Sequence, residues 1–152
     1  MEKSVSLLQL IKESFDLKEV DIRTYSPLTL AYIGDAVYDL IFRTKVVGEG
    51  NTSANKLHNK TIRYVKAPAQ AQLVNAVMEE LTPEELAVYK RGRNAKPHTI
   101  AKNASLDEYK KATGLEALVG YLYLEERMDR ALELIHIGLH KLDAQEGIKS
   151  GR

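Results

Sequence analysis

The sequence has 152 residues, of which 44% are hydrophobic and 28% charged, and its formal net charge is +1. These values are typical of one globular domain and argue against a disordered or fibrous chain. Because there is no cysteine, disulfides, thiolate metal sites and a cysteine nucleophile are excluded. We see no signal peptide and no apolar run long enough for a bilayer, so we expect a cytoplasmic protein without membrane association.

Helical periodicity and capping signals predict an all-α chain, and no segment alternates polar and apolar residues as a half-buried strand would. Ser26 before Pro27 and Ser105 before Glu108 are typical helix starts, while Pro68 should interrupt a helix. We expect one domain over residues 1–152, with a core over about residues 5–142 and a short polar C-terminal tail. The expected helices are approximately residues 5–15, 27–48, 53–67, 69–81, 83–91, 106–126 and 130–142.

Acidic residues are unevenly distributed, which leaves two basic tracts. No Asp or Glu occurs from Gly50 to Met78 or from Leu86 to Leu106. Two such tracts suggest a positive face suited to a phosphate backbone, although a solvated surface whose charges cancel in three dimensions is the alternative. The candidate contact residues are Lys56, Lys60 and Arg63 in the first tract, and Lys90, Arg91, Arg93, Asn94 and Lys96 in the second.

Residues 90–96 are expected to form a mobile loop. Gly92 should end the preceding helix, and Pro97 should prevent a new helix from starting inside the loop. The crowded positive charges repel one another, and phosphates would relieve that repulsion. A solvated surface loop without a ligand is the alternative.

Two acids stand in unusually apolar helices. Asp35 follows Gly34 in a helix that is apolar nearly all the way round, and Glu116 lies four residues before Gly120 in a second such helix. Helices of this kind are usually buried, where an ionised carboxylate is costly unless it is paired. Carboxylates from two helices suit Mg²⁺, which keeps waters as its other ligands. The alternative is that each acid caps a helix or pairs with Lys or Arg.

Several motifs resemble the ribonuclease III family. The segment LAYIGDAVYDL (30–40) is similar to the family signature with its Gly-Asp-Ala, and LEALVGYLYLE (115–125) is similar to its second acidic motif. The Gly-Glu-Gly turn at residues 48–50 resembles the turn that follows the signature helix. KRGRNAK (90–96) closely resembles the Mini-ribonuclease III branch, and the similarity extends from about residue 28 to 124.

The resemblance implies a ribonuclease III-like helical bundle that forms a homodimer and cleaves double-stranded RNA. By position, Asp35 and Glu116 are implied to be catalytic and to hold Mg²⁺, for which Mn²⁺ can substitute, during phosphodiester hydrolysis. Tyr32 occupies the aromatic position that projects toward the partner subunit, so it is the implied anchor of the dimer; an ordinary core aromatic is the alternative.

Three acidic positions of the family pattern are occupied by other residues here. These residues are Leu28, Ala31 and Thr113. Asp39 and Glu49 are therefore candidate additional acids of the site, and waters are the alternative.

The Mini branch is associated with trimming ribosomal RNA precursors, so we expect a large-subunit precursor as substrate and a ribosomal protein on that RNA as a candidate partner. The family's separate double-stranded RNA-binding domain has no matching sequence here, so the catalytic domain is expected to hold its own substrate. The rival hypothesis is a non-catalytic RNA-binding or ribosome-assembly module, which Ala31 and Thr113 favour. A helical protein-interaction domain is a third reading, but it leaves the two basic tracts unexplained.

Overall fold

The computed structural model describes residues 5–96 and 105–149. Within those ranges the protein is all-α, as predicted, and no strand is present. No helix in the described part of the chain is both long enough and apolar enough to cross a membrane. The elements are α1 (Leu7–Ser14), a 3-10 helix (Ile22–Thr24), α2 (Pro27–Gly48), α3 (Ala54–Val65), α4 (Ala67–Val77), a second 3-10 helix (Met78–Glu80), α5 (Pro83–Asn94), α6 (Leu106–Leu124) and α7 (Met128–Lys149).

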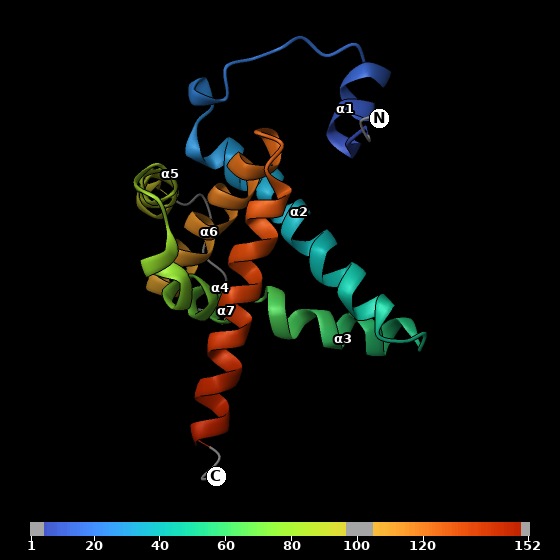
Figure 1. The fold of residues 1–152 in the computed structure, drawn as a ribbon, viewed down its shortest axis with the longest axis vertical. Coiled ribbons are helices and arrows are strands. Elements are labelled where there is room, and N and C mark those ends of the chain that lie inside the picture. The colour runs from blue at the N-terminus through green and yellow to red at the C-terminus, as the bar shows by residue number, and fades with distance from the viewer. Residues whose placement is uncertain (1–4, 97–104, 150–152) are drawn as a thin grey trace.

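Helix α6 is the centre of the bundle. It packs against α2, α4, α5 and α7, whereas α1 lies apart and is joined to α2 by a long connection (Figure 1). Leu118 and Leu122 belong to one buried apolar cluster, and Leu115 and Val119 belong to another that includes Phe42 of α2. Because α6 buries apolar side chains on both sides, an acid in this helix has little access to water.

Helices α2 and α6 touch backbone to backbone at Gly34 and Gly120. A Cβ atom on Gly34 would lie 1.7 Å from the carbonyl oxygen of Glu116, and one on Gly120 would lie 2.0 Å from that of Leu30. Both neighbours are backbone atoms, which cannot move aside as a side chain can. The crossing therefore requires glycine on both helices. It brings Asp35, which adjoins Gly34, to the same level as Glu116, which lies one turn before Gly120.

Two helices extend further than the sequence indicated. Helix α5 continues through Gly92 to Asn94 because Gly92 is buried against α6, where a Cβ would lie 2.7 Å from the Cβ of Ala117. The prediction of a loop over residues 90–96 is therefore wrong for residues 90–94, and Pro97 lies outside the described residues. Helix α7 continues to Lys149, beyond the expected end near residue 142.

A buried ion pair, which the sequence analysis did not anticipate, joins the starts of α5 and α7. Glu85 is 1% exposed, and Arg130 donates to both of its carboxylate oxygens at 2.9 Å. These hydrogen bonds hold the pKa of Glu85 below its ordinary value despite burial. Glu85 also completes a capping box with Thr82, so one carboxylate fixes both the start of α5 and its contact with α7.

We expect Gly120→Ala to lower the free energy of unfolding by about 3 kcal/mol, because the added methyl group would force α2 and α6 apart. Gly48→Ala is the matched control, since a Cβ at the end of α2 meets nothing within 4 Å. That control should be neutral or stabilising by less than about 1 kcal/mol. Urea unfolding of both variants measures the difference, and equal stabilities would show that the crossing is not tight.

Candidate active site

The structure brings Asp35 and Glu116 together across the α2–α6 crossing, within hydrogen-bonding reach of each other. Glu116 is largely enclosed, whereas Asp35 is exposed. Burial, and then the neighbouring Asp35 carboxylate, raise the pKa of Glu116 to about 8. The expectation of burial is therefore wrong for Asp35, because α2 is covered on only one side and its other side faces solvent.

Neither acid has a cationic partner in the part of the chain that the structure describes. Across residues 5–96 and 105–149, no Lys, Arg or His side chain forms an ion pair with Asp35 or Glu116. The alternative in which these acids pair with Lys or Arg is thus not observed in this part of the chain. Two adjacent carboxylates without a cation are a donor set that fits a hard divalent ion such as Mg²⁺.

The other acids considered from the sequence each pair with a cation of their own helix. Asp39 is bound to Arg43, with 2.6 Å between Oδ2 and Nε, although it lies only one turn beyond Asp35. Glu49 pairs with Lys45 at the far end of α2, about 21 Å from Asp35 along the helix at 1.5 Å per residue. No group of three or more Asp, Glu, His or Cys side chains that could hold a metal occurs among the described residues.

The positions that lack the family's acids add no charge to the site. Ala31 is 7% exposed and packs in the apolar core. The Thr113 hydroxyl donates to the carbonyl oxygen of Tyr109 at 3.0 Å, so its hydrogen bond is made within α6 and not to the carboxylate pair. The site in this protomer consequently has two carboxylates.

Gln70 of α4 is a third polar group at the site, and the sequence analysis missed it. Its side chain is 3% exposed, and its Nε2 donates to Glu116 Oε2 at 3.2 Å. The same nitrogen donates to the Val65 carbonyl oxygen at 2.8 Å, and the Oε1 atom is buried without a hydrogen-bond partner among residues 5–96 and 105–149. No local pattern distinguishes Gln70 from Gln72 and Asn75, which are also polar residues of this helix and are exposed.

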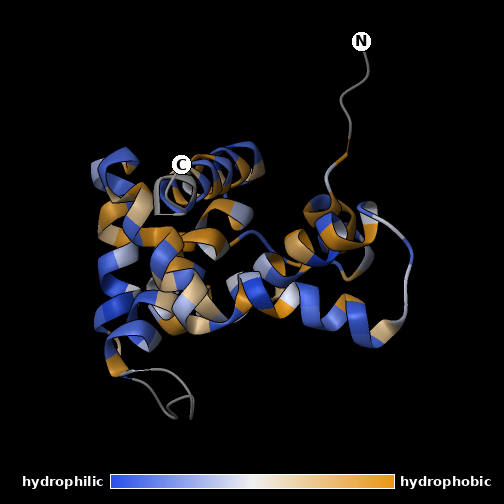
Figure 2. Ribbon diagram, turned by 90° about the horizontal axis from the view of Figure 1, so that it is seen from below, coloured by the Kyte–Doolittle hydropathy of each residue, from blue (hydrophilic) through white to orange (hydrophobic). Residues whose placement is uncertain are grey.

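The two basic tracts reach α6 near Glu116. The end of α3 is linked to Glu116 through Gln70, and Gly92 near the end of α5 packs against Ala117. Helix α3 is mainly hydrophilic in Figure 2, in agreement with its single buried residue, Thr61. Of the candidate contact residues in the two tracts, those with exposed side chains are Lys56, Lys60, Arg63, Lys90, Arg91, Asn94 and Lys96.

Arg93 is held more firmly than the other cations of its tract. Its guanidinium lies over the Tyr89 ring, 5.6 Å from the centroid, and its Nε donates to Asn94 Oδ1 at 3.3 Å. The end of α5 therefore presents a partly ordered cationic surface rather than the freely mobile loop expected from the sequence.

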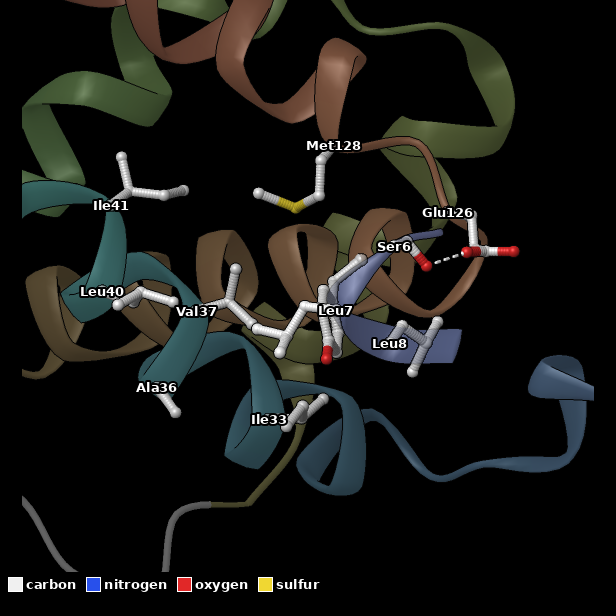
Figure 3. Close-up of a pocket in the computed structure, with 11 residues that line it drawn as sticks. Ser6, Leu7, Leu8, Ile33, Ala36, Val37, Leu40, Ile41, Glu126 and Met128 are labelled. Atoms are coloured by element: carbon white, nitrogen blue, oxygen red, sulfur yellow. Dashed lines mark hydrogen bonds between the residues drawn. The ribbon is translucent and has the colours of Figure 1, made fainter. Parts of the chain in front are cut away.

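An apolar stripe is exposed along α2, beside Asp35. Tyr32 is 82% exposed and Leu40 is 53% exposed, with the exposed Ala36 between them at helical spacing. The alternative of Tyr32 as a core aromatic is thus wrong for the single protomer. Ala36 and Leu40 also line an apolar groove between α2 and Leu7 and Leu8 near the start of α1, where the Ser6 hydroxyl donates to Glu126 Oε1 (Figure 3).

Comparison with known proteins agrees with this geometry. Residues 28–127 match the Ribonuclease III domain. A Mini-ribonuclease 3 of Clostridium tetani is 46% identical over 136 residues, which cover 86% of this chain and 89% of that protein. A Mini-ribonuclease 3 of Enterococcus faecalis is 47% identical over 124 residues, or 80% and 94% of the two chains. The crystal structure of the Fusobacterium nucleatum protein FN1578 has a TM-score of 0.72 and 30% identity, covering 80% and 98%.

We expect Mg²⁺ to raise the melting temperature of the wild-type protein and not that of Asp35→Asn, because ligand binding to the folded state alone is stabilising. Without Mg²⁺ and above about pH 8, where Glu116 is ionised, the variant should be at least as stable as the wild type, since one of two repelling carboxylates is removed. Asp39→Asn is the matched control and should keep the Mg²⁺ effect, because Asp39 is bound to Arg43. Thermal unfolding over a Mg²⁺ titration distinguishes them; an undiminished effect in Asp35→Asn would exclude Asp35 as a ligand.

Proposed function

The chain belongs to the ribonuclease III family and is an endoribonuclease of that type, and we propose that Asp35 and Glu116 form its catalytic site for double-stranded RNA. Members of this family generally depend on divalent metal ions and act on double-stranded RNA. The observation that carries the proposal is the pair of carboxylates that face each other at the α2–α6 crossing without a cationic partner among the described residues.

In this proposal Asp35 and Glu116 hold Mg²⁺, and Mn²⁺ can take its place. When bound, the ion supplies a Lewis acid for phosphodiester hydrolysis. Two carboxylates suffice to hold Mg²⁺, because this ion commonly keeps several waters in its coordination shell. Asp35 faces solvent and is accessible to a phosphodiester, whereas the more enclosed Glu116 is fixed by its surroundings.

The exposed cations of α3 and α5 are proposed to hold the RNA backbone. A-form RNA is recognised mainly through its shape, its phosphates and its 2′-hydroxyl groups, so contacts to bases are not required. The proposed contacts are Lys56, Lys60 and Arg63 from α3, and Lys90, Arg91, Arg93, Asn94 and Lys96 from the end of α5 and the residues after it. The end of α3 and the end of α5 both lie near Glu116. An RNA duplex bound to both tracts would therefore lie next to the carboxylate pair.

We further propose a two-fold homodimer formed through α2. One site of this kind cuts one strand, and a symmetric dimer supplies a second site for the opposite strand. The exposed apolar stripe of Tyr32, Ala36 and Leu40 supports this arrangement, because such stripes are typical of contact surfaces.

Precursor ribosomal RNA of the large subunit is the substrate that we propose, with a ribosomal protein on that RNA as a candidate partner. The support is the similarity to proteins named Mini-ribonuclease 3, including the KRGRNAK segment. A non-catalytic RNA-binding module is less consistent with the site. Two adjacent carboxylates without a cationic partner among the described residues would repel RNA phosphates unless they held a metal ion.

The experiment that tests the catalytic site is incubation with a long RNA duplex, with and without Mg²⁺. We expect metal-dependent shortening by the wild type, and a rate reduced by more than about 100-fold in Asp35→Asn and in Glu116→Gln, with RNA binding retained. Asp39→Asn should cut at close to the wild-type rate. Cleavage at the wild-type rate by purified Asp35→Asn would mean that the site is elsewhere.

The double substitution Arg91→Ala with Arg93→Ala should weaken binding to all duplex sequences alike. It should also reduce the slope of log affinity against log salt by roughly 0.9 per lost phosphate contact. Cleavage at saturating RNA should suffer less. Lys18→Ala with Arg23→Ala removes the same charge outside both tracts and is the matched control. Equal affinity and salt dependence in the two double variants would reject a phosphate contact here and favour α3.

Light scattering at micromolar concentration is expected to report a dimer. Tyr32→Ala should weaken it by about 2 kcal/mol or more, roughly 30-fold in Kd, because a large exposed aromatic side chain would lose its pocket in the partner. Val47→Ala, at an exposed position near the other end of α2, should have little effect. A monomeric wild type would rule out the dimer, and a dimer unaffected by Tyr32→Ala would rule out this anchor.

A further inference from the structure

We propose that Gln70 is a positioning residue of this site, which orients the Glu116 carboxylate for the metal ion and ties it to the corner between α3 and α4. The inference rests on the proposed function of Asp35 and Glu116. It concerns a third helix, α4, that supplies no acid to the site.

The orientation of the Gln70 amide is fixed by its two acceptors. Nε2 has two N–H groups, and they donate to the carbonyl oxygen of Val65 at 2.8 Å and to Glu116 Oε2 at 3.2 Å. Reversing the amide would turn its oxygen toward both acceptors and would lose both hydrogen bonds. Because the side chain is 3% exposed, packing also restricts its movement.

The hydrogen bond to Val65 anchors the amide to rigid backbone. Lys66 alone separates α3 from α4. It is the C-cap residue of α3 and the N-cap residue of α4. The Val65 carbonyl lies in the last turn of α3, where carbonyl groups lack partners within the helix. The Gln70 backbone N–H, in turn, donates to the Lys66 carbonyl oxygen at 3.0 Å. The amide that reaches Glu116 is therefore held at both its backbone and its side chain.

A neutral donor suits the position beside Glu116. Another acid would add repulsion to the existing pair, and a Lys or Arg would compete with the metal ion for the carboxylate. The amide instead holds one carboxylate oxygen through hydrogen bonding and leaves the second oxygen, and the Asp35 carboxylate, for the ion. Such partners of metal ligands commonly tune affinity by restricting ligand orientation.

The Oε1 atom of Gln70, which has no hydrogen-bond partner among the described residues, argues against a purely structural role. Leaving a buried acceptor without a hydrogen bond lowers stability, whereas an apolar side chain of similar size has no such cost. Capping Val65 alone is a weak reason to keep an amide with this penalty. The second hydrogen bond, to Glu116, supplies the functional reason.

The test compares Gln70→Met and Gln70→Leu, which remove the amide and differ in shape, with Gln72→Met at an exposed position of the same helix. Mn²⁺ affinity is measured by electron paramagnetic resonance on RNA-free protein, and folding is checked by circular dichroism. Both Gln70 variants should bind Mn²⁺ about 10-fold more weakly, to a similar degree despite different stabilities, while Gln72→Met should match the wild type. With RNA, the half-saturating Mg²⁺ concentration should rise and KM for the duplex should stay unchanged.

Folded Gln70 variants with the wild-type Mn²⁺ affinity would overturn the inference. So would a loss of Mn²⁺ affinity that differs between the two variants in proportion to their loss of stability. Asp35→Asn in the same assay separates this result from failure of the proposed function. If Asp35→Asn abolishes Mn²⁺ binding, the metal site stands and only the role of Gln70 is rejected. If the wild type binds no Mn²⁺, or Asp35→Asn binds it normally, the metal site is rejected and the inference with it.

Discussion

Helices α2 and α6 are in direct backbone contact, because Gly34 and Gly120 leave no room for side chains between them. The other features of the site depend on how closely the backbones of α2 and α6 approach each other. Asp35 and Glu116 are neighbours of the crossing in their own helices, so backbone geometry rather than flexible side chains brings the carboxylates together. The apolar clusters on both sides of α6 hold the two helices in this arrangement.

The charges around the crossing have a simple order. A compact pair of acids lies on α6 and α2, and the exposed cations lie along α3 and at the end of α5. None of the described cations neutralises the acids, and few acids neutralise the cations. This separation is costly for an isolated fold and is favourable when a divalent ion and a phosphate chain are both present. It is the electrostatic pattern that a metal-dependent nuclease requires.

Much of the fold could be predicted from the sequence, because the helix starts are local signals. The caps at Ser26 and Ser105 each accept a hydrogen bond as expected. The errors arise where tertiary packing overrides local preference. Gly92 does not break α5, because it lies against α6 and the bundle stabilises the last turn there. Asp35 is exposed, because an apolar helix can have one side covered and leave the other apolar side uncovered.

The choice of Asp35 and Glu116 came from motif resemblance together with acids in apolar helices, and the structure brings those two residues together. Gln70 could not be found in this way. Its importance depends on a contact with Glu116 across 46 residues of sequence. Glu85 and Arg130 were missed for the same reason, since their pairing joins residues 45 apart. Polar side chains reveal such long-range roles only when the fold is known.

The order of synthesis has a consequence for the carboxylate pair. Asp35 lies on the second helix and Glu116 on the sixth, so a chain still emerging from the ribosome contains the first acid long before the second. Closing so long a stretch of chain is favourable only when the contacts of α6 with α2, α4 and α5 form together. A growing polypeptide therefore has no assembled carboxylate pair until α6 has emerged and folded against α2.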